Sequence, residues 1–233
     1  LLLSGQYLSG RAHGEWTYYA ADNRVERTEH YEAGVPAGTW QQFNELGQLT
    51  ETTEFERGEK KQVRRFHSNG RLQATELYKD NLRHGAWQTF HRNGQQAEQW
   101  HYINNQLHGE YTSRDEHGVV IQSGHYNAEG KKDGLWLQFH DKDRPASKEQ
   151  YSNGKWHGVN QFFNADGQLA SECAYDQGRR HGKCQFFFDN GQLQSQTHYQ
   201  NDVQHGEELR YNEDGVLLEK FNLLDGHPTG EQF

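Results

Sequence analysis

Isolated aromatic side chains recur along the chain at a regular interval, and mostly polar residues separate them. Each interval of about 24 residues holds a glycine, usually after a histidine, with aromatics two and five positions later. A turn residue stands nine positions after the glycine, and a third aromatic stands 17 positions after it. Short ring-bearing segments divided by turns are typical of β-strands. Each interval therefore predicts two strands joined as a hairpin.

Two kinds of turn divide these segments. The first contains Asn-Gly, as in 68–70 and 92–94, and favours hairpins because it accepts positive φ angles at little cost. The second follows the pattern Tyr-x-x-Gly, where Gly, Asn or Asp at the tight position is expected to adopt a left-handed conformation. These tight positions are Gly34, Gly58, Asn81, Asn105, Gly154, Gly178 and Asp202.

The third aromatic of one repeat and the glycine of the next are equidistant from the turn between them. Tyr175 and Gly182, for example, flank a centre between Gly178 and Arg179. Since a glycine lets a ring lie against the backbone, we expect each ring to cover this glycine. The residues assigned this structural role are Tyr31, Gly38, Tyr78, Gly85, Tyr102, Gly109, Tyr151, Gly158, Tyr175 and Gly182.

The pattern resembles the MORN-type repeat, in its bacterial variant with Tyr-x-x-Gly-x-x-His-Gly-x-Trp and a later Asn-Gly turn; residues 78–87 and 151–158 show it. The resemblance covers the whole chain and implies an all-β fold, an elongated single-layer array of about nine hairpin repeats. Residues 1–233 would form one repeat domain, cut within a repeat at both ends, where Leu1 and Gly230 fill repeat slots. For residues 1–3, the end of a signal peptide stays an alternative.

Composition and charge limit the kinds of molecule that the chain is expected to bind. Hydrophobic residues make up 32% of the chain and the mean hydropathy is -1.18, yet there are 6 Trp, 12 Tyr and 12 Phe. This indicates a thin core built on rings, since disordered segments are poor in aromatics. The net charge of -9 argues against binding nucleic-acid phosphates or anionic lipids. No stretch approaches the roughly 18 apolar residues of a membrane span. A protein partner with a basic surface fits this charge.

The two cysteines, Cys173 and Cys184, are equidistant from one turn centre, so the hairpin should place them on opposite strands. Directly opposed Cβ atoms lie about 4.5–5.5 Å apart, longer than an unstrained disulfide prefers. Two interpretations stay open. A disulfide would suit an oxidising compartment and favour a periplasmic or exported protein over a cytoplasmic one. Alternatively, two small residues fill slots that hold Trp and Thr in other repeats.

The sequence contains no recognisable catalytic motif: Gly-x-Ser-x-Gly, a phosphate loop and His-Glu-x-x-His are all missing. The histidines before the glycines come one per repeat, whereas a zinc site needs about four ligands at one point. We therefore predict no catalytic residue, no metal site and no cofactor.

Positions that depart from the repeat are candidates for partner binding, because folding does not account for them. Two extra tryptophans would be exposed, and tryptophan is frequent in binding hot spots; wider ring stacking is the alternative. Residues 127–130 carry a one-residue insertion, and residues 141–145 replace an Asn-Gly turn, with neutral loop drift as the alternative. The candidates are Trp100, Glu129, Asp141, Asp143, Arg144 and Trp156.

The resemblance implies a binding scaffold, and bacterial proteins of this type are often identified as YwqK-like antitoxin or immunity proteins. We therefore expect a non-enzymatic protein that binds and occludes a toxin with a basic surface, such as a secreted lipase-type effector. The alternative is a scaffold that tethers envelope or cytoskeletal components. Lipid binding ranks third, and the charge disfavours it.

Overall fold

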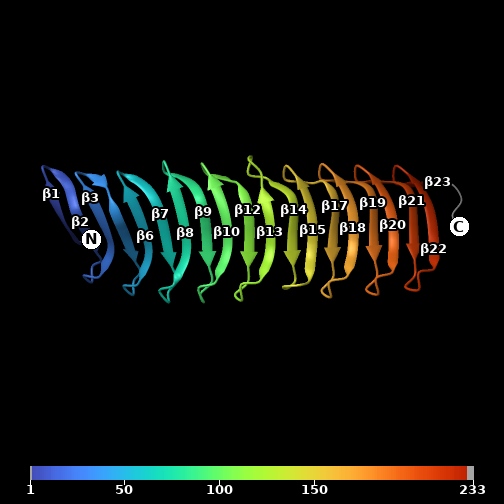
Figure 1. Cartoon of the computed structure of the whole chain (residues 1–233), viewed down its shortest axis with the longest axis horizontal. Coiled ribbons are helices and arrows are strands. Elements are labelled where there is room, and N and C mark those ends of the chain that lie inside the picture. The colour runs from blue at the N-terminus through green and yellow to red at the C-terminus, as the bar shows by residue number, and fades with distance from the viewer. Residues whose placement is uncertain (1, 230–233) are drawn as a thin grey trace. The chain divides into compact units, whose positions relative to one another are not determined.

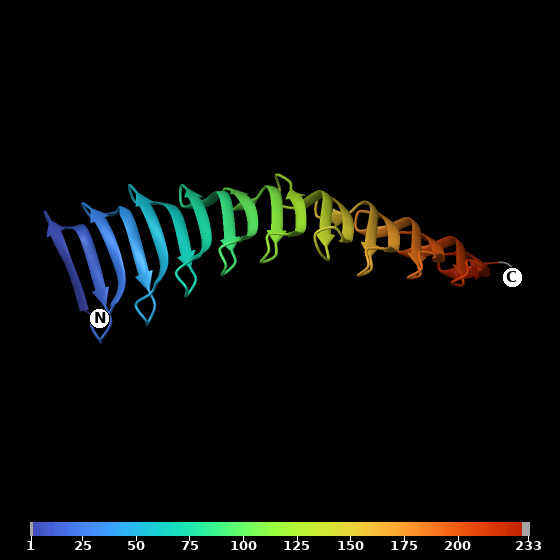
Figure 2. The ribbon, with the colours of Figure 1, turned by 60° about the horizontal axis from the view of Figure 1, so that its bottom comes forward.

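The computed structural model describes residues 2–229, and every regular element in that part of the chain is a β-strand. The chain forms two compact units: unit 1 contains residues 1–109 and 114–118, and unit 2 contains residues 110–113 and 119–233. Leu1 and Gly230 lie outside the described residues. Within each unit, successive strands pair antiparallel in an open sheet one layer thick (Figures 1 and 2). The predicted all-β fold of hairpin repeats is confirmed.

The strands of unit 1 are β1 (Leu2–Leu8), β2 (Arg11–Tyr19), β3 (Val25–Glu32), β4 (Val35–Pro36), β5 (Gly38–Phe43), β6 (Leu49–Glu56), β7 (Glu59–Phe66), β8 (Leu72–Lys79), β9 (Leu82–Phe90), β10 (Gln96–Ile103) and β11 (Gln106–Leu107). The strands of unit 2 are β13 (Val120–Tyr126), β14 (Lys132–Phe139), β15 (Pro145–Ser152), β16 (Lys155–Trp156), β17 (Gly158–Phe163), β18 (Leu169–Asp176), β19 (Arg179–Phe187), β20 (Leu193–Gln200), β21 (Val203–Tyr211), β22 (Leu217–Leu224) and β23 (His227–Thr229). Residues of β12 (Gly109–Arg114) belong to both units.

The two kinds of turn have different backbone geometry. In the Tyr-x-x-Gly turns both central residues have positive φ, as at Gln177 (50°) and Gly178 (87°), which is the arrangement of a type I′ hairpin turn. In the Asn-Gly turns only the glycine does: Gly70 has φ of 78°, and its N–H donates to the carbonyl of His67 at 2.9 Å. Both predicted hairpins therefore form, and the left-handed tight positions are confirmed at the Tyr-x-x-Gly turns.

Replacing a strained turn residue should stabilise the protein. Gln177 and Ala33 hold φ of 50° and 51°, a region that asparagine tolerates better than either residue. We expect Gln177→Asn and Ala33→Asn each to raise the free energy of unfolding by about 0.5–1 kcal/mol in urea titrations. Gln192→Asn, in an Asn-Gly turn at a position without positive φ, is the matched control and should change little. Equal effects of all three substitutions would contradict this reason.

The repeat glycine pairs with a different tyrosine from the one predicted. Gly182 lies opposite Tyr199, whereas Tyr175 lies opposite Arg180. A β-bulge in the β18–β19 hairpin shifts the register, and a side chain at Gly182 would meet the Cβ of Ala174 at 3.3 Å. The expectation that each ring covers the next glycine is therefore wrong, because symmetry about a turn does not reveal a bulge. The same holds at Gly38, Gly85 and Gly158, where the nearest side chains belong to His30, Leu77 and Gln150.

Most of the buried side chains form one row across the middle of each sheet, on one face. We call this set the central row. It consists of aromatic rings together with small, aliphatic, polar or acidic side chains on successive strands, and most of its members are buried. In unit 1 it contains Trp16, Glu29, Trp40, Thr53, Val63, Glu76, Trp87 and Trp100. In unit 2 it contains Trp136, Glu149, Asn160, Cys173, Cys184, Thr197, Glu208 and Phe221.

Tyrosines from neighbouring strands close over the tryptophans of this row, which explains how a single-layer sheet buries them. The ring of Trp136 lies 5.1 Å from that of Tyr126 and 6.3 Å from that of Tyr151, and it is 2% exposed. Below it, an added Cβ at Gly124 would lie 2.2 Å from the indole. The idea of a ring packed on a glycine thus holds at Gly124 and, under Trp16, at Gly5, rather than at the repeat glycines.

Hydrogen bonds between successive turns hold the repeats of each unit in a fixed register. At the type I′ turns the glycine N–H donates to the preceding repeat, as from Gly178 to the carbonyl of Trp156 at 2.8 Å. At the Asn-Gly turns a side chain donates to the following repeat instead, as from Asn190 Nδ2 to the carbonyl of Glu213 at 2.9 Å. Turns on one edge therefore follow each other at a constant spacing of two strands, about 10 Å.

Candidate functional site

One long edge of unit 2 is strongly acidic. It is made of four successive turns, 140–144, 164–168, 188–192 and 212–216, which lie along the lower edge of the sheet in Figure 1. We call these turns the acidic edge. Lys142 and Arg144 are its cations. Its carboxylates are Asp141, Asp143, Asp166, Asp189, Glu213 and Asp214, all exposed except the half-buried Asp141.

Local hydrogen bonds fix the geometry of this edge. Arg144 donates through Nε to Asp141 Oδ2 at 2.7 Å and through Nη1 to the carbonyl of Ala165 at 2.8 Å, so it joins two consecutive turns. The hydrogen bond from Arg144 lowers the pKa of Asp141. Asn164 Nδ2 donates to Asp189 Oδ1 at 3.3 Å and joins the next pair of turns. The carboxylates are thus held in a periodic line.

The structure separates the residues predicted to bind a partner. Asp141, Asp143 and Arg144 lie on the acidic edge. Glu129 lies on the opposite edge of unit 2, exposed, with its carboxylate 2.7 Å from Lys131 Nζ. These four residues therefore do not form a single site.

Neither predicted tryptophan is exposed. Trp100, in unit 1, is half-buried opposite Trp87 in the central row. Trp156, in unit 2, is half-buried, stacks edge-on to Tyr175 at 4.8 Å, and donates from Nε1 to Glu149 Oε2 at 3.1 Å. The expectation of exposed indoles is therefore wrong, because both side chains extend the ring packing of the sheet.

Buried carboxylates in the central row are a feature that sequence reasoning left unassigned. Glu149 is 7% exposed and accepts hydrogen bonds from Tyr151 Oη at 2.6 Å and Ser147 Oγ at 2.7 Å, besides that from Trp156. Burial opposes ionisation of Glu149, but these hydrogen bonds outweigh it and lower its pKa. Burial and the bond to Glu149 raise the pKa of Tyr151 to about 12. The motif Glu-x-Tyr, which recurs at Glu29 and Glu76, could have indicated these buried carboxylates, because each accepts a hydrogen bond from the tyrosine two residues later.

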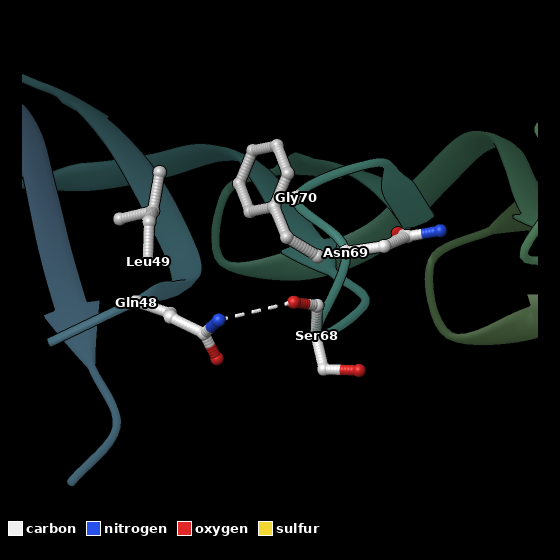
Figure 3. Close-up of a pocket in the computed structure, with 6 residues that line it drawn as sticks. Gln48, Leu49, Ser68, Asn69 and Gly70 are labelled. Atoms are coloured by element: carbon white, nitrogen blue, oxygen red, sulfur yellow. Dashed lines mark hydrogen bonds between the residues drawn. The ribbon is translucent and has the colours of Figure 1, made fainter. Parts of the chain in front are cut away.

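The surface pockets of the sheet are lined by few groups that could take part in a reaction. One in unit 1, of about 350 Å³, is lined by Gln48, Leu49, Phe66, Ser68, Asn69 and Gly70, none of which titrates near neutral pH (Figure 3). Gln48 Nε2 crosses it to donate to the carbonyl of Ser68 at 3.2 Å. Among residues 2–229, no three His, Cys, Asp or Glu side chains are grouped to hold a metal ion. No helix in the same range could cross a bilayer.

Cys173 and Cys184 lie opposite each other in the central row of unit 2, and the structure joins them in a disulfide with Cα atoms 4.0 Å apart. Cys184 is fully buried and Cys173 nearly so. The bridge links β18 to β19 at the centre of the sheet.

Reduction of this bridge should destabilise unit 2. A cross-link between residues 11 apart restricts the unfolded chain, and its loss is expected to lower the free energy of unfolding by about 2–3 kcal/mol. Urea titrations with and without reductant measure this, and a Cys173→Ser/Cys184→Ser variant should not respond to reductant. Two free thiols found by mass spectrometry of the native, unreduced protein would contradict the bridge.

A family model described as "MORN repeat variant" matches residues 83–104, 107–128, 156–177, 180–201 and 204–225. A comparison with curated proteins found no significant match. Among solved structures, the chain is similar to S. aureus TarM, crystallised as a mutant with fondaparinux, alpha-GlcNAc-glycerol and UDP, at 13% identity and a TM-score of 0.24; 57% of this chain and 21% of that one are covered. It is also similar to a TcdB2-TccC3-Cdc42 structure at 12% identity and a TM-score of 0.23, over 93% of this chain and 13% of that one.

The chain spans about a fifth or less of those two structures. Both similarities are too low to support an argument about function. The family match rests instead on five separate segments of the sequence, each about one repeat long. The strand pairs β9–β10, β17–β18, β19–β20 and β21–β22 each coincide, to within two residues, with one of these segments. The chain therefore contains five MORN repeats, in residues 83–128 and 156–225.

Proposed function

We propose that this chain is a non-enzymatic, protein-binding repeat protein, and that the acidic edge of unit 2 receives a partner with a basic surface. The observation that carries the proposal is the line of exposed carboxylates on four successive turns. Packing accounts for the central row, whereas five of these six carboxylates are exposed to solvent. The net charge of -9 would also steer a basic partner toward the chain.

The periodic arrangement supports binding by several weak contacts at once. An exposed ion pair contributes only about 0.2–1 kcal/mol, so a single carboxylate would not hold a partner. Carboxylates about 10 Å apart on a fixed sheet can engage several cations of a folded partner without first being ordered. Such binding should weaken steeply with added salt.

We further propose that the partner is a toxin, such as a secreted lipase-type effector, and that this chain is its immunity protein or antitoxin. The resemblance of the repeats to YwqK-like proteins and the negative charge support this assignment. A scaffold for envelope or cytoskeletal components would share the repeat architecture, but its partner would not be toxic.

Paired affinity captures from the source cells test the proposal. One bait carries Asp166→Asn, Asp189→Asn and Asp214→Asn on the acidic edge. The control bait carries Asp176→Asn, Asp202→Asn and Asp225→Asn on the opposite edge, with the same change in charge. We expect the wild type and the control, but not the first variant, to capture the same basic protein at low salt.

The captured protein is then expressed alone and together with this chain. Growth arrest that is relieved by the chain supports the immunity assignment. Capture of a non-toxic structural protein would overturn that assignment, and equal capture by all three baits would overturn the role of the acidic edge.

A further inference from the structure

Three exposed cations stand at successive turns on the edge of unit 2 opposite the acidic edge. Its type I′ turns lie along the upper edge of the sheet in Figure 1. Lys155 and Arg179 immediately follow two of these turns. Lys131 follows the turn 127–130 on the same edge, where only Gly130 has positive φ, and all three cations are exposed. We call these three residues the basic edge.

The basic edge is aligned by backbone geometry. A side chain at Gly154 would lie 3.4 Å from the Cβ of Lys131, and one at Gly178 would lie 3.7 Å from the Cβ of Lys155. Lys131 and Lys155 therefore each stand over the turn of the next repeat. The cations follow one another at the same spacing of two strands as the carboxylates of the acidic edge, because each repeat contributes one turn to each edge.

These cations are largely unpaired within the chain. The carboxylates at or beside these turns have partners within the chain. Glu129 lies 2.7 Å from Lys131, and Asp176 lies 3.1 Å from His157 Nδ1. Asp133 accepts from the backbone N–H of Asn153 at 3.0 Å, and Asp202 accepts from that of Arg180 at 3.0 Å. Across residues 2–229, Lys155 and Arg179 take part in no ion pair within 4.0 Å. Their charge is thus available to another molecule.

We propose that the basic edge of one molecule binds the acidic edge of unit 2 of a second molecule of the same chain. The cations of the basic edge and the carboxylates of the acidic edge complement each other in both sign and spacing. Since both edges have the same repeat, several ion pairs align at once when two copies lie edge to edge, and their effects combine. The two edges are different surfaces, so the contact does not close on itself and further copies can add.

Sedimentation velocity of the full chain over a range of concentrations tests this. At about 20 mM salt the sedimentation coefficient should rise with concentration without levelling at a dimer, and at about 500 mM salt it should stay at the monomer value. A variant with Lys155→Glu and Arg179→Glu should associate about tenfold more weakly. The control, with Lys148→Glu and Lys183→Glu on exposed strand positions, has the same charge change and should behave as wild type.

A mixing experiment distinguishes the loss of ion pairs from misfolding of the variants. A second variant, with Asp166→Lys and Asp189→Lys, should also lose self-association. The two variants then carry opposite charges on all interacting edges, so an equimolar mixture should associate although neither does alone. A wild type that stays monomeric at low salt, a control variant that is also impaired, or a mixture that stays monomeric would each overturn the proposal.

Different experimental outcomes would overturn the proposed self-association and the proposed binding of a basic partner. The Lys155→Glu/Arg179→Glu variant leaves the acidic edge intact, so it should still capture the basic partner while it no longer self-associates. Self-association that persists without capture of any basic partner would leave the edge contact standing and remove the proposed function.

Discussion

Trp136→Ala should lower the free energy of unfolding of unit 2 by about 3–5 kcal/mol. The indole is 2% exposed, packs against the rings of Tyr126 and Tyr151, and covers the backbone at Gly124. A sheet one layer thick has no second layer that could move in to fill the space. Urea unfolding followed by tryptophan fluorescence and far-ultraviolet circular dichroism measures the loss.

The neighbouring residue provides the control. Leu135 is 50% exposed and points to the other face of the same strand, so Leu135→Ala should change the stability by less than about 0.5 kcal/mol. If Leu135→Ala were as costly as Trp136→Ala, the central row would not be the core of the unit.

Glu149→Gln should cost about 1–3 kcal/mol at neutral pH, because three donors around a buried carboxylate would lose an ionised acceptor. The pKa of Glu149 is lowered in the folded state, so its stabilisation is complete above the ordinary value of 4.5. It is lost as the pH falls from there through the lowered pKa. The difference between wild type and variant should therefore be largest at neutral pH and shrink in acid, which urea titrations at several pH values would show.

Glu172→Gln is the matched control for this substitution. Glu172 is half-buried on the other face of unit 2 and has one side-chain donor, Gln161 Nε2, at 2.7 Å. We expect a change within about 0.5 kcal/mol at neutral pH. A cost for Glu149→Gln that stays constant from neutral to acidic pH would contradict the role of its ionised form.

The hairpins could be predicted from the sequence because each depends on local chemistry. Asn-Gly and Tyr-x-x-Gly set the turns within a few residues, and the positive φ at Asn81, Asn105 and Asp202 follows from the tolerance of Asn and Asp for that region. The pairing of Cys173 with Cys184 was also predicted, although the turn is centred between Gln177 and Gly178. The bulge between this turn and the cysteines restores the pairing that a centre between Gly178 and Arg179 predicts.

The register near the turns could not be predicted in this way. Counting from a turn assumes that every residue has one partner, and the bulge at Gly182 breaks this assumption. The burial of Trp100 and Trp156 was missed for a related reason. Exposure in a single-layer sheet depends on whether rings from two neighbouring strands close over a position, and spacing along one strand does not report that.

The acidic edge was foreseen only in part. Asp141 and Asp143 attracted attention because their turn departs from the Asn-Gly pattern. Asp166, Asp189 and Asp214 stand in ordinary turns and look unremarkable one at a time. Their common edge becomes visible only when the strands are stacked, because residues about 24 apart in the sequence then lie two strands apart.

The most direct test of the account is a hydrogen–deuterium exchange footprint of the captured basic partner on this chain. We predict slower exchange on binding at turns 140–144, 164–168, 188–192 and 212–216, with the turns of the opposite edge unchanged. Protection confined to turns 152–156 and 176–180, or to unit 1, would contradict the claim that the acidic edge of unit 2 is the binding surface.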